Sequence, residues 1–100
     1  MTERDLATIR SAVPLPALYE LLAEECTELA HAALKAARRL RAENPTPLTF
    51  GECRHMAQEE ISDVHLVARV LGLKPDPEMV RHKLERWYER LEGHDRAGDP

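Results

Sequence analysis

The sequence contains few of the residues that build turns, disulfide bonds and aromatic clusters. Of its 100 residues, four are glycine, four are aromatic and two are cysteine. Cys26 and Cys53 form neither a C-x-x-C motif nor a zinc-binding spacing, so we expect free thiols in a reducing compartment. Runs of alternating β-branched residues are missing, which argues against β-strands. A disulfide-stapled domain is therefore excluded, and an all-α protein is favoured.

Positive charge and long apolar runs are also scarce. Fourteen Lys and Arg residues against 18 Asp and Glu residues give a formal net charge of -4, whereas binding to nucleic acid requires a basic surface. No apolar run approaches the ~18 residues of a membrane-spanning helix, and the charged residues 1–5 lead into no apolar signal region. We expect a cytoplasmic protein that binds neither nucleic acid nor a membrane.

Proline, glycine and capping residues divide the chain into one short and three long predicted helices. Their expected ranges are 2–12, 16–43, 49–71 and 77–93. The expected signals at their ends are Thr2 with Asp5, Thr49 with Glu52, Gly72, Asp76 and Gly93. We predict a single all-α domain over residues 1–93, followed by a flexible tail over residues 94–100.

The second predicted helix is long for so short a chain. At ~1.5 Å per residue it extends for roughly 40 Å, which exceeds the reach of a compact globule formed by 100 residues. Its apolar stripe (Leu18, Leu22, Leu29, Ala33, Ala36 and Leu40) therefore requires a second subunit. We expect a helical bundle that is completed by oligomerisation, as a homodimer or a homotetramer.

Two of the predicted helices carry carboxylates on or beside their apolar faces. On a helical wheel, Glu60 lies in the middle of the apolar face of residues 49–71, with Asp63 one turn further on. Glu25 and Glu28 border the apolar stripe of residues 16–43, with the same i, i+3 spacing. If the two helices pack antiparallel, the four carboxylates can converge. Hard oxygen ligands of this kind favour Mg²⁺ or Mn²⁺.

A simpler interpretation treats these acidic side chains as solvated residues or as ion-pair partners. The basic residues available for such pairs are Lys35, Arg38, Arg39 and Arg69. Lys35 and Arg39 also follow Glu28 by about two and three helical turns on nearly the same side. They could therefore contact the phosphate chain of a nucleotide held at the carboxylates, although a solvated helix face would have the same pattern.

Three segments of the sequence form an ordered set of motifs. Residues 24–29 read EECTEL, residues 59–64 read EEISDV and residues 83–92 read KLERWYERLE. Together they resemble the E-E-x-x-E-L, E-E-x-x-D and K-aromatic-x-R-x-aromatic segments of the MazG-like nucleoside triphosphate pyrophosphohydrolases, with Leu84 at the first aromatic position. The likeness covers roughly residues 16–92, with a longer loop through residues 44–48 between the first two motifs.

The resemblance implies an all-α fold and a Mg²⁺-dependent hydrolase. Such an enzyme cleaves a nucleoside triphosphate between its α- and β-phosphates and releases a monophosphate and pyrophosphate. Carried over to this chain, the metal-binding and catalytic residues are Glu25, Glu28, Glu60 and Asp63. Lys83 and Arg86 match the family's basic positions near the phosphates. The chemistry suits these residues, because hydrolysis of a polyphosphate needs charge neutralisation and an aligned water more than a protein nucleophile.

Two other functions compete with this one. Glu28-x-x-His31 and Glu52-x-x-His55 have the Glu-x-x-His spacing of ferritin-like di-metal bundles, which would bind iron. Alternatively, the apolar stripes could bind a partner helix in a non-enzymatic adaptor. In that case we expect Glu60→Gln to raise stability without affecting any activity.

Trp87 and Tyr88 are two of the four aromatic residues of the chain. Whichever function applies, we expect both to pack in the core.

Overall fold

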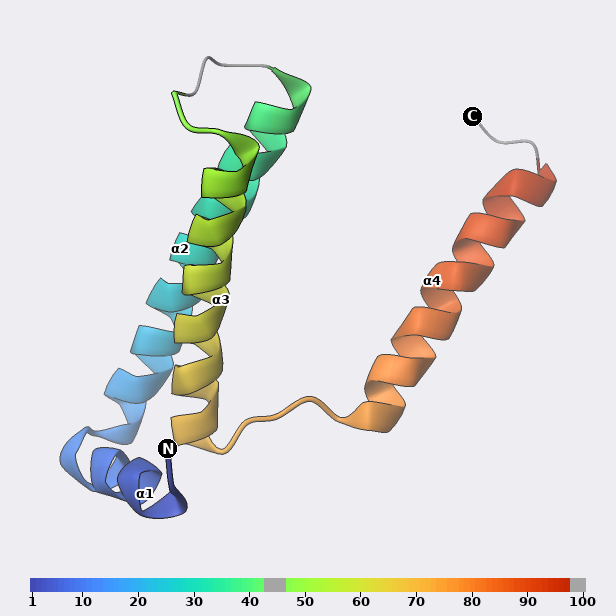
Figure 1. Ribbon diagram of the computed structural model, residues 1–100. Coiled ribbons are helices and arrows are strands. Elements are labelled where there is room, and N and C mark those ends of the chain that lie inside the picture. The colour runs from blue at the N-terminus through green and yellow to red at the C-terminus, as the bar shows by residue number, and fades with distance from the viewer. Residues whose placement is uncertain (43–46, 98–100) are drawn as a thin grey trace.

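The computed structural model describes residues 1–42 and 47–97, and this part of the chain folds into helices without any strand. In chain order they are α1 (Glu3–Ala12), α2 (Leu15–Arg41), α3 (Phe50–Leu71) and α4 (Pro77–Ala97) (Figure 1). The predicted all-α class and the count of one short and three long helices are confirmed. None of the helices in this part of the chain is long and apolar enough to span a membrane.

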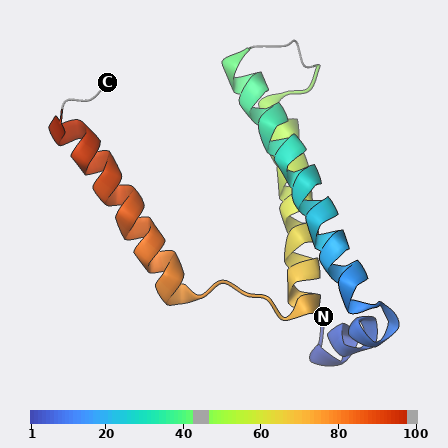
Figure 2. The same ribbon diagram turned by 180° about the vertical axis from the view of Figure 1, so that it is seen from behind.

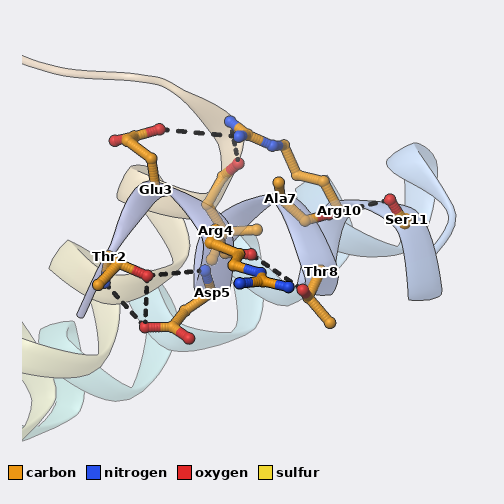
Figure 3. Close-up of polar contacts among 9 residues, drawn as sticks. Thr2, Glu3, Arg4, Asp5, Ala7, Thr8, Arg10 and Ser11 are labelled. Atoms are coloured by element: carbon orange, nitrogen blue, oxygen red, sulfur yellow. Dashed lines mark hydrogen bonds and ion pairs between the residues drawn. The ribbon is translucent and has the colours of Figure 1, made fainter.

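Capping boxes fix the starts of α1 and α3. Thr2 Oγ1 accepts a hydrogen bond from Asp5 N at 3.2 Å, and Thr2 N donates to Asp5 Oδ2 at 2.8 Å (Figure 3). Thr49 and Glu52 exchange the equivalent bonds at 3.1 and 3.2 Å. A cap of this kind contributes about 1 kcal/mol to the stability of the helix. Both boxes were expected from the sequence and are confirmed.

The other helix ends agree with the sequence in part. Gly72 ends α3 in the left-handed region at φ 75°, and Asp76 Oδ1 accepts hydrogen bonds from the first turn of α4, as predicted. The α2 helix stops at Arg41 because Ala42 adopts a left-handed conformation at φ 54°; the expected end at residue 43 lies outside the described residues. The α4 helix continues through Gly93 to Ala97, because Gly93 does not adopt the positive φ that would end it. Residues 98–100 of the predicted tail lie outside the described residues.

Helices α2 and α3 pack side by side along their length, and α1 lies across the end of this pair (Figures 1 and 2). The three helices meet at a small apolar cluster of Leu6, Leu18 and Val70. The Arg10 guanidinium also donates a 3.4 Å hydrogen bond to the Val70 carbonyl oxygen at the end of α3. Leu6 is the one buried residue of α1, so the docking of α1 depends mainly on this side chain.

Helix α4 stands apart from the α2–α3 pair (Figures 1 and 2). The radius of gyration is 18.1 Å, compared with about 13 Å for a compact domain of 100 residues. The prediction that Trp87 and Tyr88 pack in the core is wrong for this chain, because both are more than 60% exposed. Ile61 and Leu66 of α3 are also 52% and 42% exposed, so within one chain this side of α3 faces solvent.

Candidate metal centre

The contact between α2 and α3 follows a seven-residue repeat on both helices. The α2 residues that are buried or half-buried along this seam are Leu18, Leu22, Glu25, Leu29, Ala32 and Ala36. The corresponding α3 residues are Cys53, Ala57, Glu60, Val64, Val67 and Leu71. Spacings of four and three alternate in each set, which is the repeat of helices that wind around each other. Glu25 and Glu60 thus occupy positions that would normally carry apolar side chains.

Three of the four predicted ligands come together at this seam. One carboxylate oxygen from each of Glu25, Glu60 and Asp63 lies within 4.8 Å of the other two. Glu25 and Glu60 are half-buried, whereas Asp63 is exposed at the edge of the seam. Glu28 is not part of this triad, but it lies beside Glu60 in an adjoining cavity. The antiparallel packing assumed from the sequence therefore brings together three of the four carboxylates that were predicted to converge.

Each of the two seam carboxylates has one oxygen without a hydrogen-bond partner and lacks a basic partner. Glu25 Oε2 and Glu60 Oε2 are buried, and neither accepts a hydrogen bond. Within the described part of the chain, the ion pairs involve other residues and leave the triad without a Lys or Arg partner. This arrangement disfavours the simpler interpretation, in which these groups pair with nearby basic residues.

Burial and mutual repulsion raise the pKa of both seam carboxylates. For Glu25, desolvation raises the pKa most, followed by the negative charges of Glu28, Asp63 and Glu24. For Glu60, desolvation again comes first, and the charges of Glu28 and Asp63, a hydrogen bond with Glu28 and the charge of Glu25 raise the pKa further. Without a cation, the ionised cluster is therefore electrostatically unfavourable.

The donor set of the cluster fits a hard divalent cation. All of its ligand atoms are carboxylate oxygens, and Mg²⁺ and Mn²⁺ prefer such donors over nitrogen or sulfur. A cation would also supply the positive charge that the orphaned oxygens of Glu25 and Glu60 lack. Glu25, Glu60 and Asp63 are thus the residues that would hold a metal ion in this chain.

A cavity of about 200 Å³ opens beside the cluster. Its lining residues are Glu28, His31, Ala32 and Lys35 of α2, together with Met56 and Glu60 of α3. Three of them, His31, Ala32 and Met56, were not among the residues predicted to form the nucleotide site. The signal was present in the sequence, since positions 28, 31 and 35 share one face of a helix.

The four residues predicted to contact phosphate are found in different surroundings. Lys35 lines the cavity, whereas the Nε of Arg39 donates a 2.9 Å hydrogen bond to the Leu48 carbonyl oxygen, near the loop between α2 and α3. Lys83 and Arg86 lie on α4, away from the cluster (Figure 1). Within one chain, the structure therefore brings only Lys35 to the carboxylates.

The residues of the ferritin-like alternative do not come together. Glu52 is engaged in the capping box with Thr49, and His55 Nε2 forms a 3.0 Å contact with Glu59 Oε1. Only the pair of Glu28 and His31 lines the cavity. A di-metal site would need both Glu-x-x-His pairs, so this geometry favours a centre made of carboxylates alone.

Comparisons of the chain with protein-family models, with curated proteins and with solved structures find no match.

Proposed function

We propose that this protein is a Mg²⁺-dependent nucleotide pyrophosphohydrolase of the MazG-like type. The observation that carries the proposal is the pair of buried, orphaned oxygens of Glu25 and Glu60 at the centre of an acidic triad. The ordered motifs over residues 24–29, 59–64 and 83–92 support the same assignment. The substrate would be a nucleoside triphosphate or deoxynucleoside triphosphate, and the products would be the monophosphate and pyrophosphate.

The carboxylates of the cluster have different roles in this reaction. Glu25, Glu60 and Asp63 would hold the cation, because their oxygens converge. When bound, the cation neutralises phosphate charge and lowers the pKa of a water molecule. A carboxylate of the cluster that is not fully used by the cation accepts the proton of the attacking water. The elements of water add across the bond between the α- and β-phosphates, and no covalent enzyme intermediate is needed.

Oligomerisation is part of the proposal. The residues of α4 that form an exposed apolar stripe are Val80, Leu84, Trp87 and Leu91, each more than half exposed. Burial of this stripe against a second copy would remove a large apolar surface from water. We therefore propose a homodimer or a homotetramer, in which the basic residues of α4, Lys83 and Arg86, can approach a phosphate chain bound to another copy.

The exposed stripe also supports the second candidate function, a non-enzymatic adaptor that binds a partner helix through α4. An adaptor does not require the carboxylate cluster for its activity. The two functions therefore differ in their response to substitution of Glu60, which lies on α3 and far from the α4 stripe in sequence.

The test is a panel of nucleoside and deoxynucleoside triphosphates incubated with Mg²⁺ and assayed for pyrophosphate. We expect at least one nucleotide to be cleaved, and we expect Glu60→Gln and Asp63→Asn to abolish that activity. Glu59→Gln is the matched control, because this neighbouring carboxylate is exposed and paired with His55. The enzymatic proposal fails if no nucleotide is consumed, or if the two cluster variants retain the parent's rate.

A further inference from the structure

Charge is distributed unevenly along the α2–α3 pair on either side of the carboxylate cluster. All four Lys and Arg residues of α2 lie within its last seven residues, 35–41, whereas its four acidic residues precede them in the range 20–28. Because α3 runs back from the connecting loop, its Arg54 lies at the same end, together with Glu52 and Glu59. Beyond the cluster toward the loop, the pair is therefore basic, and an anion is favoured there.

The cavity beside the cluster extends along α2 toward this basic end. It begins at Glu28 and Glu60 and continues along α2 to His31 and Lys35, two groups that can donate hydrogen bonds to an anion. Lys35 is half-buried, which strengthens its attraction for an anion relative to a fully solvated lysine. A phosphate chain that extends from the cation in this direction therefore meets positively charged side chains, of which Lys35 is the first.

Two exposed leucines lie on the other side of the cluster. Leu21 precedes Glu25 by four residues and Leu66 follows Asp63 by three. Each leucine therefore lies about one helical turn from a carboxylate of the cluster, on the same face of its helix. They are 37% and 42% exposed. The nearest arginine of α3 in this direction, Arg69, lines a separate cavity with Arg10 and Lys74 at the α1 end. Leucine side chains suit the flat face of a base, not a phosphate.

We propose that the substrate lies lengthwise along the α2–α3 pair, with the pyrophosphate leaving group against Lys35 and His31 and the nucleoside over Leu21 and Leu66. This inference rests on the proposed function, which supplies the substrate and the position of the bond that is cleaved. It adds the direction of the substrate and assigns the cavity as a pyrophosphate subsite.

The experiment measures the binding of the two products separately. Inorganic pyrophosphate and the monophosphate of the best-cleaved nucleotide are titrated by calorimetry in the presence of Mg²⁺, with the parent and with Lys35→Gln. Loss of a charge-assisted contact is expected to weaken pyrophosphate binding about tenfold or more and to leave monophosphate binding unchanged. Lys74→Gln is the matched control, since it removes the same charge far from the cavity, and Leu66→Ala should weaken the monophosphate alone. Circular dichroism confirms that each variant folds.

The outcomes separate this inference from the function on which it rests. If the parent cleaves nucleotides and Lys35→Gln weakens the monophosphate instead of pyrophosphate, the substrate lies in the opposite direction and the inference is overturned while the function stands. Equal affinities for pyrophosphate in the parent and Lys35→Gln overturn it as well. If the parent cleaves no nucleotide, the proposed function fails, and the pyrophosphate titration alone then decides whether the cavity binds this anion.

Discussion

Replacement of Glu60 by Gln is expected to have opposite effects on the protein with and without a divalent cation. Without one, the substitution removes a negative charge from a seam position where Glu60 Oε2 has no hydrogen-bond partner, so Tm should rise. With Mg²⁺ at about 100 times its Kd, binding to the folded state alone stabilises the parent by about 2.7 kcal/mol. For a domain of this length, that corresponds to a rise in Tm of roughly 10–20 °C.

The variant keeps only two of the three carboxylates that converge within 4.8 Å, so most of this Mg²⁺-dependent rise should disappear. The assay is thermal unfolding of the parent, Glu60→Gln and Glu59→Gln, followed by circular dichroism over a series of MgCl₂ concentrations. Glu59→Gln should respond to Mg²⁺ as the parent does. A Mg²⁺ response in Glu60→Gln as large as that of the parent would show that Glu60 does not hold the cation, and a lower Tm than the parent in the absence of cation would show that its charge does not destabilise the seam.

Three further predictions concern pH, packing and assembly. In the folded, metal-free chain the pKa values of Glu25 and Glu60 are raised above the ordinary value of 4.5, so these groups destabilise the fold increasingly as pH rises from about 4.5 through their raised pKa values. The Tm of Glu60→Gln should therefore exceed that of the parent by less in acid than at neutral pH. A Tm difference that does not change with pH would contradict this prediction. Leu6→Ala should lower the free energy of unfolding by about 2–5 kcal/mol, because Leu6 is 1% exposed and packs with Leu18. If urea unfolding shows a loss below about 1 kcal/mol, other contacts hold α1 in place. Light scattering should give the parent a mass of a dimer or a tetramer and give Leu84→Glu the monomer mass of 11.4 kDa; a parent that already has the monomer mass rules out the proposed assembly.

Local features of the fold could be predicted from the sequence because a few neighbouring atoms determine them. The capping boxes at Thr2 and Thr49 and the left-handed Gly72 each depend on residues within one helical turn. The end of α2 was less predictable, since a left-handed alanine at position 42 has no sequence signature comparable to glycine. Gly93 illustrates the converse, because a glycine inside a helix does not have to end it.

The position of α4 could not be predicted, because it depends on tertiary contacts. Its stripe of apolar residues has the pattern of a buried helix face, and the same pattern serves for packing within a chain or against another molecule. The described structure leaves this stripe exposed. Periodicity alone therefore identified the face of α4 that needs covering, but not what covers it.

The candidate site could be predicted in large part, since Glu25, Glu60 and Asp63 do converge. The detail that sequence reasoning missed is the seam of α2. A wheel at 100° per residue placed Ala33 and Leu40 on the buried stripe, but both are exposed and Ala32 is buried instead. A strict seven-residue repeat, expected for two helices that wind around each other, moves Ala32 and Glu25 into the seam.

The most direct test of the central claim is to locate a bound cation. Crystals of the protein soaked in MnCl₂ should show an anomalous scattering peak between the carboxylates of Glu25, Glu60 and Asp63, and crystals of Glu60→Gln should lack it. A Mn²⁺ peak elsewhere with none at the seam, or a structure in which these carboxylates separate into solvent, would contradict the account.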